Sequence, residues 1–162
     1  MSDATDPPSD ALAAALGRVP SGLFVLTAAP DGRETGMLAS WVQQCSFAPP
    51  QVTVALNNAR PLAGQLLDGA PFVLNVIPEG GKSLVAHFGK GFEPGEPAFD
   101  GLDVLRDGGP PVLQAAHAYL VCRVAARVAA GDHTLVVARV TAGAVLRDAK
   151  PAVHVRKNGL RY

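Results

Sequence analysis

The stretch LVCRVAARV, residues 120–128, gives the clearest sign of the fold. One parity of this stretch carries Leu120, Cys122, Val124, Ala126 and Val128, and the other carries Val121, Arg123, Ala125 and Arg127. Because successive side chains of a strand point to opposite faces, this period of two predicts a strand with one buried face. Gly131-Asp132-His133 interrupts the pattern, and residues 134–145 are predicted to form the next strand.

Further extended segments lie on both sides of this pair. Residues 22–29, 35–47, 52–56, 72–77 and 152–155 are rich in apolar and β-branched side chains, and Pro30-Asp31-Gly32 and Pro49-Pro50 are turn signals between them. Short helices are predicted over residues 10–16, 61–67 and 83–88, the first of them capped by Ser9. Six or more strands with two or three short helices indicate a mainly β fold, an antiparallel barrel that is closed or nearly closed.

The composition indicates one globular domain over residues 9–162, preceded by a disordered tail at residues 1–8. The chain has 162 residues, of which 48% are hydrophobic and 17% charged, so it can bury a core of its own. Fourteen basic residues balance fourteen acidic ones. This neutral balance gives no general attraction to nucleic acid or to an anionic membrane, and neither is an expected partner.

The N-terminus and the cysteines indicate the compartment. MSDATDPPSD lacks a basic start and an apolar segment, so no secretory signal is recognised, and no apolar run is long enough to cross a membrane. Cys45 and Cys122 form no metal-binding or disulfide motif. We expect a cytoplasmic protein with two reduced, buried thiols and no metal site.

Several stretches, taken in register, resemble a known family. GMLASWVQQCSFAPP at residues 36–50, FVLNV at 72–76 and GDH at 131–133 are similar to the flavin reductase-like family. The similarity extends from about residue 12 to Tyr162 and is closest to the flavin reductase module of diflavin flavoproteins. The resemblance implies a Greek-key split β-barrel that binds FMN, with FAD as an alternative. The other modules of a diflavin protein are not present in these residues, so any electron donor is expected to be a separate molecule.

The flavin ring is expected to lie along one strand. The resemblance implies that Met37, Leu38, Ala39, Ser40 and Trp41 contact the cofactor, and small side chains at positions 39 and 40 would let main-chain amides approach the ring. Ser46 and Phe47 are included in the expected site on the same ground. Trp41, the only tryptophan, is as compatible with a core position as with a cofactor contact.

The flavin phosphate is expected where a strand ends and a helix begins. Asn57, Asn58 and Arg60 precede Pro61, and the free N–H groups of a helix N-terminus together with a guanidinium suit a phosphate. The alternative is a capped turn with a solvated arginine. A buried amide needs a partner, so Asn75 is predicted to bind either the flavin or neighbouring backbone.

The long segment from residue 89 to residue 101 is expected to cover the site. His87, Phe88 and Phe92 flank it, and their rings are predicted either to cover the flavin or the nicotinamide, or to tie the segment to the barrel. The basic C-terminal run Arg156–Tyr162 is predicted either to lie near the cofactor or to be a solvated tail.

His133 is the candidate catalytic residue. It lies between two strands, so we expect it to be displayed at a rim of the barrel, with Asp132 orienting its ring. The resemblance implies that this histidine lies where the nicotinamide meets the flavin; the alternative is a turn histidine with local hydrogen bonds. Hydride transfer needs no acid or base on carbon, so positioning of the donor is its expected role.

The resemblance implies an NAD(P)H-dependent flavin reductase that passes hydride to flavin N5. No GxGxxG motif is present, so the nicotinamide is expected in an open groove over the flavin. The alternative is an FMN-binding electron-transfer protein that works with a protein donor or acceptor. The resemblance also implies a homodimer.

Overall fold

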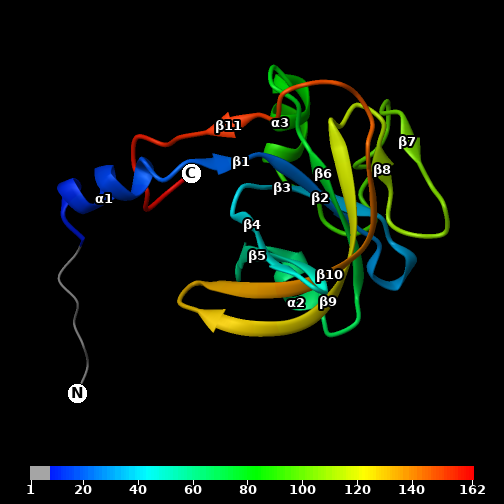
Figure 1. Cartoon of the computed structure of the whole chain (residues 1–162), viewed down its shortest axis with the longest axis horizontal. Helices are drawn as coiled ribbons and strands as arrows, with labels where there is room; N and C mark the ends of the chain where they lie inside the picture. Colours follow the sequence, from blue (N-terminus) through cyan, green and yellow to red (C-terminus); the bar gives the residue numbers. More distant parts are fainter. Residues whose placement is uncertain (1–7) are drawn as a thin grey trace.

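The structure is a computed structural model that describes residues 8–162 (Figure 1). The predicted tail at residues 1–8 lies outside the described residues except for Pro8. No helix of the described chain is long and apolar enough to cross a membrane.

A seven-stranded sheet forms the body of the molecule, in agreement with the prediction of six or more strands. Its order is β3 (Thr35–Ala39), β2 (Phe24–Ala28), β6 (Pro71–Val76), β9 (Ala118–Ala130), β10 (His133–Val145), β5 (Pro50–Asn57) and β4 (Val42–Phe47). Every neighbouring pair is antiparallel. The mainly β, antiparallel split-barrel prediction is confirmed.

The two edges of this sheet are joined by only two residues. Residues 35–47 were expected to form one extended segment, but the chain leaves β3 at Ala39 and begins β4 at Val42, on the opposite edge. Ser40 and Trp41 make this crossing, and the amide of Ala55 in β5 donates to the Trp41 carbonyl at 3.0 Å. The sheet therefore curls until its two edges lie close together. No ladder of hydrogen bonds joins β3 to β4, so the barrel is split there. We use "the crossing" for Ser40 and Trp41.

Three short helices accompany the sheet: α1 (Asp10–Gly17), α2 (Pro61–Gln65) and α3 (Lys82–Gly89). The predicted cap is present, since Ser9 accepts a hydrogen bond from the Leu12 amide. Two small two-stranded sheets complete the fold, β1 (Ser21–Gly22) with β11 (Val153–His154) and β7 (Val104–Leu105) with β8 (Val112–Leu113). A turn at Pro30–Gly32 joins β2 to β3.

The core consists of two apolar clusters. The first fills the barrel and includes Leu26, Val54, Leu74 and Val136, all without solvent exposure. The second lies under α3 and the long loop around Phe88 and also includes Val25, Ile77 and Leu113. Strand β2 contributes to both clusters, which makes it the wall between them.

The predicted alternation of β9 holds only for its first half. Cys122 and Val124 are buried, but Val128 is 53% exposed. A β-bulge lies at the point where Val137 pairs with Ala126 and Ala138 with Val124. Because a bulge inserts one extra residue into the strand, side chains beyond it that would have faced the barrel interior face outward, and the other set faces inward. Arg127 therefore turns toward α2, where its guanidinium donates to the Ala63 carbonyl at 2.6 Å.

Asn75 in β6 is fully buried and bonded to protein groups. Its side-chain amide donates to the Val25 carbonyl at 3.0 Å and to the Thr27 hydroxyl at 3.4 Å, and its side-chain oxygen accepts from the Leu113 amide at 2.8 Å. Both amide hydrogens are used. Of the two predicted partners, neighbouring backbone is the one that these contacts show.

The two cysteines differ from each other. Both are free. Cys122 is buried, which raises the pKa of its thiol to about 12 and keeps it protonated. Cys45 is exposed, so the prediction that it is buried is wrong. It lies in the edge strand β4, at the irregularity in strand pairing between Gln44 and Ser46, and its side chain is not packed into the barrel interior.

The two ends of the chain form an arm beside the barrel (Figure 1). We use "the arm" for residues 9–22 and 153–162. Strands β1 and β11 pair in it, and the Arg156 and Gly159 amides donate to the carbonyls of Gly17 and Ala13. A Cβ atom at Gly159 would collide with Leu16, so only glycine allows this close packing. The arm thereby fixes the C-terminal residues against the crossing.

Candidate functional site

Two adjoining cavities lie on the β3 side of the crossing. The larger has a volume of about 260 Å³ and the smaller about 150 Å³, and Met37 and Arg60 line both. The larger is lined by Leu23, Met37, Leu38, Ala39, Ser40, Ala55, Asn57, Arg60, Val85, Gly89, His154 and Tyr162. Its wall is therefore mostly apolar, with Asn57, Arg60 and His154 as its amide- or charge-bearing side chains.

The strand that the sequence singled out forms one wall of this cavity. Met37, Leu38, Ala39 and Ser40 all line it, as the prediction requires. Ala39 and Ser40 have small side chains, so little side chain separates the strand backbone from the cavity. As an edge strand, β3 has a ladder partner on one side only.

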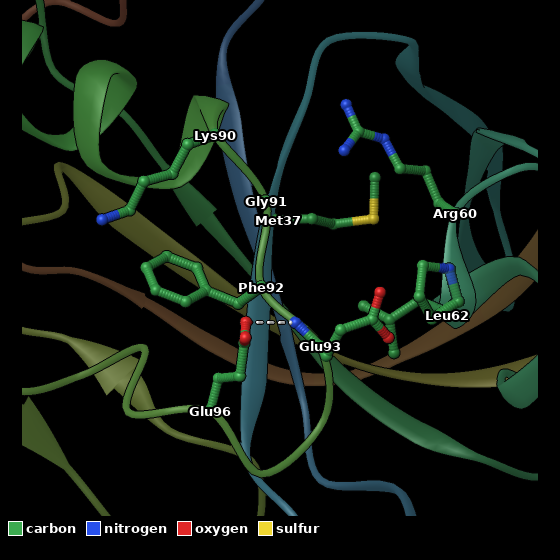
Figure 2. A pocket seen from close by; sticks show the side chains of 9 residues that line it. Met37, Arg60, Leu62, Lys90, Gly91, Phe92, Glu93 and Glu96 are labelled. Atoms are coloured by element: carbon green, nitrogen blue, oxygen red, sulfur yellow. Dashed lines mark hydrogen bonds between the residues drawn. The ribbon is translucent and has the colours of Figure 1, made fainter.

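Arg60 extends between the two cavities. Figure 2 shows its guanidinium and the Met37 side chain pointing toward one another, with Glu93 and Glu96 farther along the same wall. Within residues 8–162, the guanidinium has no carboxylate partner within 4.0 Å. An unpaired cation at one end of an apolar cavity is suited to an anionic group of a ligand.

The residues around Arg60 form a tight turn. The side-chain oxygen of Asn57 accepts from the Ala59 amide at 2.9 Å, and Arg60 is the residue before α2. Asn58, also predicted to be in the site, instead accepts from the Thr134 hydroxyl at 2.7 Å and does not line either cavity. The turn thus directs Asn57 and Arg60 inward and Asn58 outward.

His133 and Trp41 lie on the outer side of the crossing. His133 is only 7% exposed, so the prediction that it is displayed at a rim is wrong. Its ring packs under Trp41, with ring centroids 4.7 Å apart. The Arg156 guanidinium carbon lies 5.1 Å from the centroid of the Trp41 ring, and Tyr162 lies 6.0 Å from it.

The histidine ring has one partner. Its Nδ1 lies 2.6 Å from the carboxylate of Asp132, which accepts a hydrogen bond from the ring. This hydrogen bond, together with the nearby charge, lowers the pKa of Asp132. The predicted orienting role of Asp132 matches this contact. Nε2 is buried and has no hydrogen-bond partner in the described part of the chain.

The long loop is fastened to the barrel by the rings predicted there. His87 Nε2 lies 2.7 Å from the Ala98 carbonyl oxygen, and the Thr35 hydroxyl donates to the Phe92 carbonyl at 3.2 Å. Phe88 is fully buried against Phe92 and Phe99, with centroids 5.9 Å apart in both pairs. Of the two predicted roles, the tie to the barrel is the one observed for His87 and Phe88, while Phe92 also lines the smaller cavity.

Two predicted residues lie elsewhere. Ser46 and Phe47 are at the far end of β4, where Ser46 pairs with Gln51 and Phe47 is 90% exposed. Neither lines the two cavities. The break at Ser40 and Trp41 explains this result, because it sends β4 to the other edge of the sheet.

Sequence reasoning missed some of the lining residues. Val85 comes from α3, His154 from β11 and Tyr162 from the end of the chain. The basic C-terminal run Arg156–Tyr162 was a signal for Tyr162 and not for His154. The places of both residues depend on the pairing of β11 with β1, about 130 residues earlier in the chain. Such a distant pairing has no local pattern.

The arrangement fits a ligand with a flat, largely apolar ring and an anionic end. The apolar wall suits the ring and Arg60 suits the anion. The described residues contain no group of three or more His, Cys, Asp or Glu side chains placed to hold a metal ion.

Comparison with known proteins agrees with this geometry. Residues 16–160 match the family model described as flavin reductase like domain. Diflavin flavoprotein A 1 of Synechocystis sp. is 42% identical over 151 residues, which cover 91% of this chain and 26% of that protein. The chain thus spans about a quarter of the length of the curated relatives it matches.

Solved structures show the same fold. The styrene monooxygenase flavin reductase of Pseudomonas putida S12 is 29% identical with a TM-score of 0.74, covering 88% of this chain and 90% of that one. The NADH:FAD oxidoreductase of Streptomyces globisporus C-1027 is 23% identical with a TM-score of 0.82, covering 96% and 94%.

Proposed function

This chain belongs to the flavin reductase like family, and on that premise we propose that it is a flavin oxidoreductase domain that binds FMN in the cavity beside β3. The observation that carries the proposal is the guanidinium of Arg60, which lies at one end of an apolar cavity and has no carboxylate partner among residues 8–162. The isoalloxazine ring would lie against Met37–Ser40, and the phosphate would lie at Arg60.

The choice of FMN over FAD rests on charge. Beyond Arg60 the smaller cavity contains Glu93 and Glu96, and the Glu96 carboxylate is held in place because it accepts from the Glu93 amide at 2.8 Å. These carboxylates would repel the second phosphate of FAD, whereas the single phosphate of FMN ends at Arg60.

We propose a reduced nicotinamide as the electron donor. The C4 carbon would give a hydride, two electrons with one proton, to flavin N5 and leave as oxidised nicotinamide. The Streptomyces oxidoreductase with this fold has been solved with NAD and FAD fragments. The protein's part is to hold the two rings together and to keep the donor in position, the role proposed here for His133.

A protein electron donor is the second candidate. The C-terminal segment that ends in Tyr162, a lining residue of the cavity, carries Arg156, Lys157 and Arg161. A positive segment on a chain of zero net charge favours an acidic partner. In this case the flavin would pass electrons without direct contact with a nicotinamide.

A homodimer is also proposed. A groove of about 520 Å³ separates the arm from the outer face of β5 and β10, lined by Val19, Val153 and Leu135 among others. Val19 and Val153 are 64% and 70% exposed. A second copy would cover these apolar side chains.

The test is a flavin titration followed by anaerobic reduction. We expect Arg60→Ala to weaken FMN binding severalfold and to make it less sensitive to salt, while the affinity for riboflavin, which has no phosphate, stays unchanged. Arg123→Ala, whose side chain bonds the Gly69 carbonyl outside the cavities, is the matched control. Equal affinity of the mutant and the parent for FMN would remove Arg60 from the phosphate site.

Reduction separates the two donors. Bleaching of bound FMN by NADH or NADPH under anaerobic conditions supports the nicotinamide. Bleaching by a reduced acidic electron-transfer protein alone supports the second candidate and contradicts the first.

A further inference from the structure

A glycine of the long loop lies directly against the Arg60 guanidinium. Gly91 has a φ of +77°, in the left-handed region that favours glycine. A Cβ atom at this position would lie 2.9 Å from Nη1 of Arg60, which is too close for a carbon atom. Both residues line the smaller cavity (Figure 2). The guanidinium therefore occupies space that any residue other than glycine would take at position 91.

The backbone on both sides of Gly91 is tied to the fold. The Gly91 amide donates to the Phe88 carbonyl at 3.2 Å, at the end of α3. The carbonyl of the next residue, Phe92, accepts from the hydroxyl of Thr35, which is fully buried at the start of β3. These contacts hold the loop, whereas an arginine side chain is long and flexible. A clash at position 91 would therefore be relieved by movement of the guanidinium and not of the loop.

The same loop keeps its own charged side chains away from Arg60. The Glu96 carboxylate accepts from the Glu93 amide at 2.8 Å, and the guanidinium has no carboxylate within 4.0 Å among the described residues. Figure 2 shows Lys90 and Arg60 on opposite sides of Gly91. The loop thus leaves the guanidinium both space and freedom from ion pairs, which are what a phosphate needs from it.

We propose that Gly91 is a positioning residue for Arg60 and thereby sets the preference of the cavity for a phosphorylated flavin. This inference rests on the proposed function. A guanidinium binds a phosphate well only when its N–H groups point at the phosphate oxygens, so its strength depends on where it is held. Riboflavin has no phosphate, and its binding does not depend on the position of the guanidinium. Gly91 therefore acts on the ratio of the FMN affinity to the riboflavin affinity.

The first test adds the missing Cβ atom. We expect Gly91→Ala to weaken FMN binding by about threefold or more, though no more than Arg60→Ala does, and to leave the riboflavin affinity unchanged. Gly91→Asn places the same atom with a residue that tolerates a left-handed backbone, and it should lower the affinity ratio as well. An affinity ratio equal to that of the parent in both variants overturns the proposal, and so does an equal loss of FMN and riboflavin affinity.

Gly32→Ala is the matched control. Gly32 has a φ of +75°, and a Cβ atom there meets no atom within 4 Å. It lies in the turn between β2 and β3 and lines neither cavity. Gly32→Ala therefore carries a similar backbone strain without a contact to Arg60, and it should keep the affinity ratio of the parent.

The second test is a double-mutant cycle. In a chain that already carries Arg60→Ala, Gly91→Ala should leave the FMN affinity unchanged, because there is no guanidinium to displace. A loss of FMN affinity from Gly91→Ala that is as large in the Arg60→Ala chain as in the parent would show that position 91 acts by another route, and it overturns the proposal.

The two proposals fail in different ways. Absence of FMN binding by the parent chain overturns the proposed function, and with it the role of Gly91. FMN binding by the parent, with the same preference for FMN over riboflavin in the parent and in Gly91→Ala, overturns the role of Gly91 alone.

Discussion

Two buried polar side chains, Asn75 in the barrel wall and His133 at the crossing, are treated differently by the fold. Asn75 makes three hydrogen bonds that tie β2, β6 and β8 together. His133 makes one, and its second ring nitrogen has no partner among the residues that the structure describes. A satisfied buried amide fixes a structure, whereas an unsatisfied imidazole costs stability and is available to a ligand.

The largest effect is expected on stability, at Asn75. Asn75→Ala leaves the Leu113 amide and the Val25 carbonyl buried without their partner, and it should lower the free energy of unfolding by about 2–4 kcal/mol. Chemical denaturation measures this change. Asn58→Ala, at an exposed residue, is the control and should cost under about 1 kcal/mol. If Asn75→Ala lowered the free energy of unfolding no more than Asn58→Ala does, the hydrogen bonds of Asn75 would not be what fixes this part of the barrel.

The reverse pattern is expected at His133. His133→Ala should slow anaerobic reduction of bound FMN by nicotinamide about tenfold or more, because the donor loses its positioning contact. Unfolding should change less than in Asn75→Ala, since one of the two ring nitrogens has no bond to lose. His117→Ala, at an exposed ring that contacts the Arg147 carbonyl, is the control. Unchanged reduction kinetics would exclude His133 from the mechanism.

A smaller effect is expected from the arm. Gly159→Ala brings a Cβ atom into Leu16 and should destabilise the arm by about 1–3 kcal/mol. Because Tyr162 and His154 line the cavity, FMN binding should weaken severalfold. Gly109→Ala meets open space and serves as the control in the same titration. Full FMN affinity in Gly159→Ala would show that the arm does not shape the cavity.

The smallest effect concerns an exposed ion pair. Arg106 donates two hydrogen bonds to Glu34, at 2.7 and 2.8 Å, and these bonds hold the pKa of the Glu34 carboxyl below its usual 4.5. A lowered folded-state pKa gives stability that is present above pH 4.5 and is lost as the pH falls through the folded-state pKa. Glu34→Gln should therefore lower Tm by about 1–3 °C at neutral pH. The difference in Tm between Glu34→Gln and the parent should vanish in more acidic solution. A Tm difference that grows as the pH falls would contradict the stabilising role given to the Glu34 carboxylate.

The sequence predicted what depends on local pattern. The strands over residues 72–77 and 134–145, the turn at residues 30–32 and the Ser9 cap arise between near neighbours, and each was found. The wall of the cavity at residues 37–40 was predicted through resemblance and lies at the cavity.

The rest depends on distant contacts. The register of β9 against β10 sets the bulge that exchanges the two faces of β9, and this bulge accounts for the exposed Val128. The curling of the whole sheet sets the break at Ser40 and Trp41, and this break moves Ser46 and Phe47 away from the site. Tyr162 reaches the cavity only because the two ends of the chain pair. No window of neighbouring residues contains that information.

The most direct test of the account is the dissociation constant of FMN for the purified chain, measured by quenching of flavin fluorescence. We predict one FMN per chain with a dissociation constant of about 1 µM or lower, equal to ~8 kcal/mol of binding free energy. An FMN fluorescence signal that stays unchanged as the protein is titrated to about a hundredfold above that concentration would contradict the central claim.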